Sequence, residues 1–203
     1  MGNPSIAPEE RFTYRHYRTW PDSERWELIE GRAWAISPAP TRKHQKIAGR
    51  LFSKLHVFLE GHPCEVYQAP FDVLLPAMYE MDDEVDTVVQ PDMAVFCDPA
   101  KLRDAGARGA PDLVVEILSP GTAKKDLNEK FRLYEKRGVR EYWIIDPEAW
   151  SVCVYRLLYT GKFDEGELRE RLGDDSPIAS EVIQGFMIDC RYLFAGFERF
   201  TTA

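Results

Sequence analysis

The stretch PDLVVEILSPGT, residues 111–122, constrains the fold of this 203-residue chain more than any other. Apart from Asp112 and Glu116, its first eight residues are apolar, and they do not alternate with polar ones. A strand of this kind is buried on both faces, so it needs a helical layer on each side. We therefore predict an α/β fold with a central mixed β-sheet flanked by helices. An apolar content of 44% is enough for such a core.

Two elements are predicted before this strand. Residues 25–37, RWELIEGRAWAIS, alternate around Gly31 in the manner of an N-terminal β-hairpin. Residues 41–61 carry apolar side chains at helical spacing and end at a glycine, which predicts an amphipathic helix. The polar residues 1–22 are expected to form a loose N-terminal arm or a short helix. Because the sequence contains no internal repeat or linker, residues 1–203 are expected to form a single domain.

Further strands are predicted on both sides of the central one. They cover residues 64–76, 90–97, 140–147 and 151–159. A second helix is predicted to begin at Asp126, with Glu129 as the other half of a capping box, and to end at Gly138. The side chains of this helix that are expected to face the core are those of Leu127, Phe131 and Tyr134.

The charge of the chain limits its partners. A net charge of −8 argues against indiscriminate binding to nucleic acid, which requires a basic surface. It does not exclude an enzyme that gathers its basic residues into one cleft. The predicted helix over residues 41–61 has a basic face, made of Arg42, Lys43, Lys46, Arg50 and Lys54. Such a face is usually solvated, but it would be a track for phosphates if it bordered a cleft.

The sequence also carries signals of location. No stretch approaches the ~20 apolar residues of a transmembrane helix, so no membrane contact is expected. The first residues, MGNPSIAPEERF, lack the apolar core of a secretory signal. Four cysteines, at positions 64, 97, 153 and 190, lie far apart without metal-binding spacing. They are expected to be reduced thiols in a cytoplasmic protein, rather than a zinc site or disulfide framework.

Glu116 is the exception inside the central strand. Burying a carboxylate costs several kcal/mol, roughly, unless another group compensates it. Asp92 begins a second apolar run, and adjacent strands lie ~4.8 Å apart, so the two carboxylates could converge on one cation. A hard divalent ion such as Mg²⁺ or Mn²⁺ allows two buried carboxylates to stay ionised together. Asp112 is on the same strand as Glu116 but ~13 Å away, which makes it a poor partner.

Lys130 could add a cation to this site. The loop after the central strand returns the chain to the second helix, and Lys130 lies in its early turns. Three residues after Leu127 and four before Tyr134, it borders the predicted buried stripe. An ammonium there could orient or deprotonate an attacking water and offset charge that develops on a phosphate.

These residues carry a family resemblance. Pro91-Asp92, then Glu116, then a lysine resembles the PD-(D/E)XK nuclease superfamily, which has the restriction-endonuclease-like fold. More closely, the chain resembles the bacterial Uma-two family of restriction-endonuclease-like proteins. The matching stretches are WELIEG, HQKIAGRL, VVQPDMAV, GAPDLVVEILSPGTAKKD and EKFRLYEKRGVREYWIIDP. The resemblance implies the fold, a divalent metal and hydrolysis of phosphodiester bonds.

The chain departs from the superfamily pattern at one position. The pattern has a lysine two residues after the glutamate, where this chain has Leu118. The family resemblance implies that the lysine has moved to the following helix, at Lys130. Three further residues, Glu30, His44 and Gln45, are accessory or substrate-binding candidates. Each also has a structural interpretation, and for His44 a hydrogen-bonded position in the core is the more usual one.

The three main site residues have structural alternatives as well. Asp92 after a proline could be a turn former. Glu116 could be paired with an arginine such as Arg132 or Arg140. Lys130 could be one solvated lysine among many on a helix. The metal-binding interpretation depends on Asp92 and Glu116 lying together.

Three functions fit these residues. The first is a Mg²⁺- or Mn²⁺-dependent nuclease acting on nucleic acid, DNA in the first place, with Asp92 and Glu116 as metal ligands and Lys130 as the assisting cation. The second is a catalytically inactive accessory or interaction protein on a nuclease scaffold, which the acidic charge and Leu118 favour. The third is a hydrolase of small phosphodiesters. A homodimer is possible because a small domain with exposed aromatic strands can pair edges or faces.

Overall fold

The computed structural model describes residues 11–21, 23–36, 39–171 and 177–197. Its main sheet has six strands in the order β12-β11-β10-β9-β6-β3. These strands are β3 (Glu65–Gln68), β6 (Met93–Phe96), β9 (Leu113–Ile117), β10 (Glu141–Asp146), β11 (Ser151–Arg156) and β12 (Glu167–Glu170). Strand β9 runs parallel to β10 and antiparallel to β6, so the sheet is mixed, as predicted.

A second sheet has the order β2-β1-β5-β4-β8-β7. Its strands are β1 (Trp26–Ile29), β2 (Arg32–Ala35), β4 (Val73–Leu74), β5 (Val88–Val89), β7 (Leu102–Arg103) and β8 (Gly106–Arg108). A small pair, β13 (Ile178–Ala179) and β14 (Met187–Ile188), lies near the C-terminus. Strands β1 and β2 form the predicted hairpin, and Glu30 and Gly31 both take positive φ at its two-residue turn.

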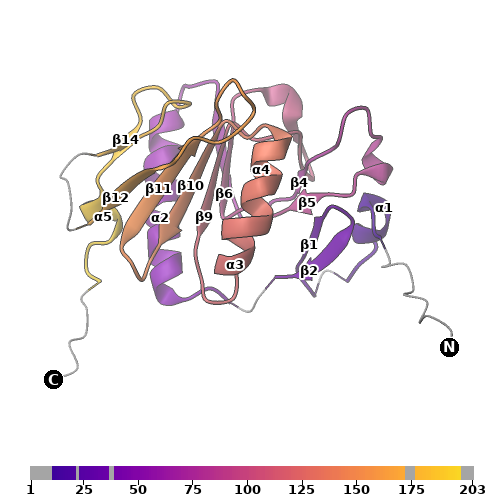
Figure 1. Cartoon of the computed structure of the whole chain (residues 1–203), viewed down its shortest axis with the longest axis horizontal. Helices are drawn as coiled ribbons and strands as arrows, with labels where there is room; N and C mark the ends of the chain where they lie inside the picture. The colour runs from indigo at the N-terminus through magenta and orange to yellow at the C-terminus, as the bar shows by residue number, and fades with distance from the viewer. Residues whose placement is uncertain (1–10, 22, 37–38, 172–176, 198–203) are drawn as a thin grey trace, which may run out of the picture.

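Helices cover both faces of the main sheet, which is why β9 is apolar on both sides. The helical elements are α1 (Tyr14–Tyr17), α2 (Arg42–Leu59), α3 (Ala123–Lys125), the π-helix η3 (Asp126–Lys130), α4 (Phe131–Arg137), α5 (Cys190–Leu193) and the 3₁₀ turns η1 (Asp82–Glu84) and η2 (Pro99–Lys101). Figure 1 shows the main strands between α2 and α4. Leu113, Val115 and Ile117 pack in the α2 layer, whereas Val114 packs in the α4 layer. Glu116 shares the α4 side with Val114 because side chains alternate along a strand.

The N-terminal segment differs in part from its prediction. Residues 14–17 form the short helix α1, and the aromatic side chains before β1 pack against Leu28, Leu74, Val85 and Val88. Those aromatic residues are Phe12, Tyr14, Tyr17 and Trp20. This stretch is therefore not a loose arm, because aromatic burial holds it to the second sheet. Residues 1–10 and 22 of the predicted arm lie outside the described residues.

The helix after β9 begins earlier than predicted and contains a π-turn. It starts at Ala123, so Asp126 and Glu129 do not form its capping box. Asp126 is 1% exposed, whereas Leu127, expected in the core, is 47% exposed. The wider π-turn over residues 126–130 shifts the buried face to Asp126, Lys130 and Tyr134. The C-terminal end at Gly138, in the left-handed conformation, is as predicted.

The cysteine prediction is wrong for one pair. Cys64 and Cys97 form a disulfide, while Cys153 and Cys190 are free. The reason is the register between β3 and β6, in which Glu65 lies opposite Phe96. Extending that register by one residue places Cys64 and Cys97 opposite each other. No described helix is long and apolar enough to cross a membrane.

Candidate active site

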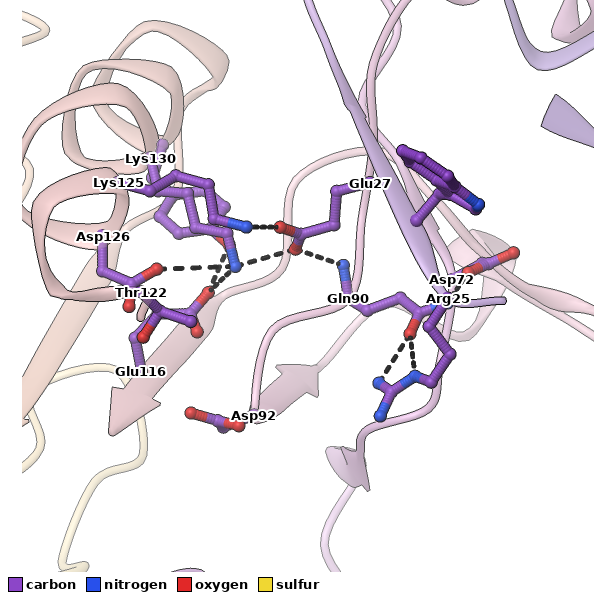
Figure 2. A network of polar contacts seen from close by, with 12 residues as sticks. Arg25, Glu27, Asp72, Gln90, Asp92, Glu116, Thr122, Lys125, Asp126 and Lys130 are labelled. Carbon is purple, nitrogen blue, oxygen red and sulfur yellow. Dashed lines mark hydrogen bonds and ion pairs between the residues drawn. The ribbon is translucent and has the colours of Figure 1, made fainter. Parts of the chain in front are cut away.

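A buried ammonium lies where β9, the η3 turn and the β1–β2 hairpin meet. Lys130 Nζ is 2.7 Å from Glu116 Oε1, 2.8 Å from Glu27 Oε1 and 3.8 Å from Asp126 Oδ1. Figure 2 shows Lys130 between Glu116 on one side and Glu27 on the other. Lys130 and Glu116 are each 3% exposed, so neither charge is solvated by bulk water. Each of them is stabilised instead by the other.

Two further side chains complete this arrangement, which we call the Lys130 cluster. It consists of Glu27, Glu116, Lys125, Asp126, Lys130 and Tyr134. The Tyr134 hydroxyl donates to Glu116 Oε1 at 2.8 Å, and Lys125 Nζ lies 2.5 Å from Glu27 Oε2. The π-turn makes this possible because it aligns residues 126, 130 and 134 on the face that meets β9. The predicted approach of Lys130 to Glu116 is present.

Sequence reasoning assigned neither Lys125, Asp126 nor Tyr134 to this site, and it also missed Glu27. Glu27 lies on β1, belongs to the WELIEG stretch and is 1% exposed. Its Oε1 also accepts a hydrogen bond from the Gln90 backbone N–H at 2.9 Å, which ties the hairpin to the chain before β6. Glu30, the accessory candidate of the same stretch, is exposed at the hairpin turn and pairs with Lys136. Glu30 lies beyond the end of β1, in the turn itself, whereas Glu27 lies within the strand.

The charges of the cluster shift one another's pKa. Burial alone would lower the pKa of Lys130, but Glu116, Glu27 and Asp126 outweigh it and raise this pKa well above its ordinary value. Burial raises the pKa of Glu116 to about 8, because neighbouring carboxylates offset the opposing effect of Lys130. For Glu27, Lys130 and Lys125 outweigh burial, so its pKa is lowered. The cluster therefore holds a protonated lysine beside a carboxyl group that titrates near neutral pH.

Asp92 lies at the edge of this cluster. The pairing of Met93 with Val115, extended by one residue, places Asp92 opposite Glu116. Asp92 Oδ2 accepts a hydrogen bond from the Ile117 N–H at 2.8 Å and lies 3.1 Å from His44 Nε2. His44 is buried on α2, as expected for a hydrogen-bonded core histidine. The His44 contact and the Ile117 N–H hold the Asp92 carboxylate from two sides.

The donor set suits a divalent ion held by two carboxylates. Within the described part of the chain, both hydrogen bonds to Glu116 end on Oε1, and both contacts of the Asp92 carboxylate end on Oδ2. One oxygen of each carboxylate is thus left for another ligand. Among these residues, no group of three His, Cys, Asp or Glu is arranged to hold a metal. Two carboxylates with an oxygen each to offer are a donor set of the size that Mg²⁺ accepts when waters fill its other positions.

The structure decides between the alternatives raised for Glu116 and Lys130. Glu116 pairs with Lys130 and not with an arginine, whereas Arg140 pairs with Asp112 at 3.2 Å. Lys130 is not a solvated helix lysine. Gln45 is exposed on α2 and contributes no described side-chain contact to the Lys130 cluster.

The basic face of α2 is occupied by contacts within the chain. Lys46 lies over the Phe197 ring, and Lys54 lies over the Tyr192 ring. Arg50 donates to two backbone carbonyls of the C-terminal segment, at Leu193 and Ala195. Most of this face therefore holds the last part of the described chain in place, which makes it a poor phosphate track.

Comparisons with known proteins agree with this fold. A family model described as "Uma2: Putative restriction endonuclease" matches residues 14–191. A Synechocystis protein named "Uncharacterized protein slr1290" is 26% identical over 167 residues, 81% of this chain and 78% of that protein. A second Synechocystis protein, "Uncharacterized protein sll1609", is 26% identical over 137 residues, 66% of this chain and 73% of that protein.

A solved structure has the same fold. It is the crystal structure of a putative nuclease belonging to DUF820 from Anabaena variabilis. It superposes with a TM-score of 0.71 at 21% identity and covers 90% of this chain and 97% of its own. The restriction-endonuclease-like architecture predicted from the sequence is therefore confirmed at the level of the fold.

Proposed function

Because the chain belongs to the Uma2 family of putative restriction endonucleases, we propose that it is a divalent-metal-dependent nuclease that hydrolyses phosphodiester bonds in DNA. Family membership supports a nuclease-like function. The proposal of metal dependence depends on one observation, the contact of Lys130 with Glu116 beside the carboxylate of Asp92. The fold alone does not support metal dependence, since one fold hosts many functions.

Asp92 and Glu116 would hold Mg²⁺ or Mn²⁺ through the oxygen that each leaves without a hydrogen bond. When bound, such an ion supplies Lewis acidity and lowers the pKa of a water ligand. The protein's own residues then place the substrate and offset its charge. Ile117 N–H and His44 orient the Asp92 carboxylate, and Tyr134 orients that of Glu116.

Lys130 is suited to electrostatic stabilisation and not to proton abstraction. Its pKa is raised by the surrounding carboxylates, so the amine stays protonated at neutral pH. A protonated amine cannot take a proton from water, but it can stabilise the negative charge that develops on a phosphate in the transition state. Glu27 and Asp126 hold it in that state.

A non-catalytic accessory protein is the second candidate. It is favoured by the ion pairs of Lys130, which already compensate Glu116 and Glu27 without an added ion. The hydrolase of small phosphodiesters uses the same site as the nuclease and is distinguished from it by substrate size. A homodimer and a cytoplasmic location remain predictions.

The proposed function is tested by cleavage of supercoiled plasmid and of single-stranded DNA with Mg²⁺, with Mn²⁺ and with EDTA. We expect cleavage only with a metal ion, and losses of at least ~100-fold in Asp92→Asn, Glu116→Gln and Lys130→Met. Glu60→Gln, an exposed carboxylate at the end of α2, is the matched control and should cut like the wild type. Equal cutting by the wild type and all three site variants would place the activity elsewhere, and absence of cutting by the wild type would favour the accessory protein.

A further inference from the structure

A cavity of about 860 Å³ opens between the β1–β2 hairpin and the helix that carries Lys130. Its polar and aromatic lining consists chiefly of Arg11, Glu30, Arg32, Trp34, Arg132 and Lys136, and we call it the hairpin pocket. In Figure 1 the hairpin lies beside α3, at the lower end of the helix. The volume is within the range of about 300–1,000 Å³ that is usual for small-ligand sites. None of the roles assigned above uses this cavity.

The lining of the hairpin pocket is basic, although the chain is acidic. Arg11 is compensated by Asp86, and Lys136 by Glu30. Arg32 and Arg132 are exposed, and within the described residues neither has a carboxylate partner. Of the charged side chains that line the cavity, four are basic and two, Glu30 and Glu129, are acidic. This excess of basic groups suits an anionic ligand, and guanidinium groups bind phosphate in a bidentate manner.

Trp34 adds an aromatic surface to these charges. Its side chain is half-buried and packs against the core that contains Ile29 and Leu133. The Arg32 guanidinium lies over its ring at 5.3 Å from the centroid. Its indole Nε1 is buried, with no hydrogen-bond partner in the described structure. A cation–π contact at an exposed site is weak, so a stacked ligand can displace or join the Arg32 guanidinium.

The hairpin pocket and the Lys130 cluster lie between the same two elements, the β1–β2 hairpin and the helix after β9, although no member of the cluster lines the pocket. In the hairpin register, Trp34 lies opposite Glu27, and Arg32 lies opposite Ile29. Opposite residues of a strand pair share a face, so Trp34 and Glu27 point to the same side. From the facing helix, Arg132 follows Lys130 by two residues and also lines the pocket. The pocket and the cluster therefore neighbour each other along both the hairpin and the helix.

We propose that the hairpin pocket binds one nucleotide of a single-stranded or locally unpaired nucleic-acid segment next to the bond that is cut. The base stacks on Trp34 and the Arg32 guanidinium, and Arg32 and Arg132 bind the adjacent phosphate. Stacking on an aromatic platform combined with phosphate contacts is how proteins hold single strands without reading a sequence. This inference rests on the proposed function, because it takes nucleic acid as the substrate.

The test is a binding measurement that needs no cleavage. The affinity of the full-length protein for a fluorescein-labelled 12-nucleotide oligothymidylate is measured by anisotropy in EDTA over a range of salt concentrations. We expect Trp34→Leu to weaken binding about 5- to 100-fold, the size of one base stack, and Trp34→Phe to weaken it less. Arg32→Gln combined with Arg132→Gln should reduce the salt slope by about 1.4, as expected for two lost phosphate contacts on a single strand.

Arg42→Gln and Lys54→Gln, on the basic face of α2, are the matched controls and should bind like the wild type. Thermal unfolding of each variant shows whether it is folded, and Trp34→Phe keeps the test valid if Trp34→Leu does not fold. The inference is overturned if the wild type does not bind, if the pocket variants bind like the wild type, or if the α2 variants alone lose affinity. Binding with the expected losses but no cleavage under any metal condition would overturn the proposed nuclease and leave the pocket assignment standing.

Discussion

Lys130 Nζ and Glu116 Oε1 lie 2.7 Å apart, joining the end of the central strand to the π-turn that follows it. Both side chains are buried, and the same lysine contacts Glu27 from a different sheet. A contact of this kind fixes the helix, the strand and the hairpin to one another. The contact also places a protonated amine beside a carboxyl group that has one oxygen without a hydrogen bond. The proposed chemistry is based on this arrangement.

Lys130→Met should lower the free energy of unfolding by about 3–5 kcal/mol at pH 7, because it leaves buried carboxylates without their cation. Lys124→Met, an exposed substitution in the same helix, should change it by less than about 0.5 kcal/mol. Urea unfolding followed by circular dichroism measures both. If Lys130→Met were as stable as the wild type, Lys130 would not be compensating these carboxylates.

Glu116→Gln should change how stability depends on pH. The Glu116 pKa is raised from 4.5 to about 8, so the folded state binds more protons than the unfolded state between these values. The contribution of this group to the stability of the wild type therefore falls as the pH rises through this window. Relative to the wild type, Glu116→Gln should become more stable from pH 5 to pH 8.

Urea unfolding at pH 5, 6, 7 and 8 measures this difference. Glu30→Gln is the control, because the Lys136 hydrogen bond lowers the Glu30 pKa and this carboxyl titrates below the window. Parallel stability curves for Glu116→Gln and the wild type would show that Glu116 does not titrate there.

Glu27→Gln should move the alkaline limit of activity to lower pH. Glu27 is one of the carboxylates that raise the Lys130 pKa, and the amide keeps its size but not its charge. Lys130 then loses its proton at a lower pH, and the rate falls earlier as the pH rises. The measurement is the pH profile of the cleavage rate with saturating metal. A lower rate with an unchanged profile would assign Glu27 a structural role alone.

His44→Ala should weaken Mn²⁺ binding about 10- to 100-fold, the usual effect of removing the partner of a metal-binding side chain. His44 holds the Asp92 carboxylate through Nε2 at 3.1 Å. His44→Gln can still donate from its amide and should lose less. His56→Ala, an exposed change on the same helix, is the control. Calorimetric titration measures the affinities, and identical values for all four proteins would remove His44 from the site.

The sequence contains enough to predict the fold and the approach of Lys130 to Glu116. The non-alternating apolar pattern around Glu116 requires layers on both faces, and α2 and α4 supply them. The spacing from Glu116 to Lys130 is also sufficient to predict that the two side chains meet. A short loop and the first helical turns bring the lysine back over the end of the strand. The meeting of Asp92 with Glu116 around a cation stays a prediction, since the described contacts of the Asp92 carboxylate are with His44 and Ile117.

Glu27 could not be found in the same way. A hairpin strand such as WELI shows which residues alternate, but not which face meets a helix a hundred residues away. Burial of a carboxylate on β1 depends on Lys125 and Lys130, which reach it only in the folded chain. The π-turn was missed because regular helical spacing gave Leu127 a place in the core, and local geometry reversed this. These errors arise where tertiary charge pairing overrides local pattern.

The most direct test of the account is a double-mutant cycle on Glu116 and Lys130, read as single-turnover cleavage rates with Mn²⁺. Residues that act as one unit are strongly non-additive. We therefore predict that Glu116→Gln and Lys130→Met each reduce the rate at least ~100-fold and that the double variant is no slower than the slower single variant. Rates near that of the wild type in either single variant, or losses that multiply in the double variant, would contradict the claim that these two residues form one active site.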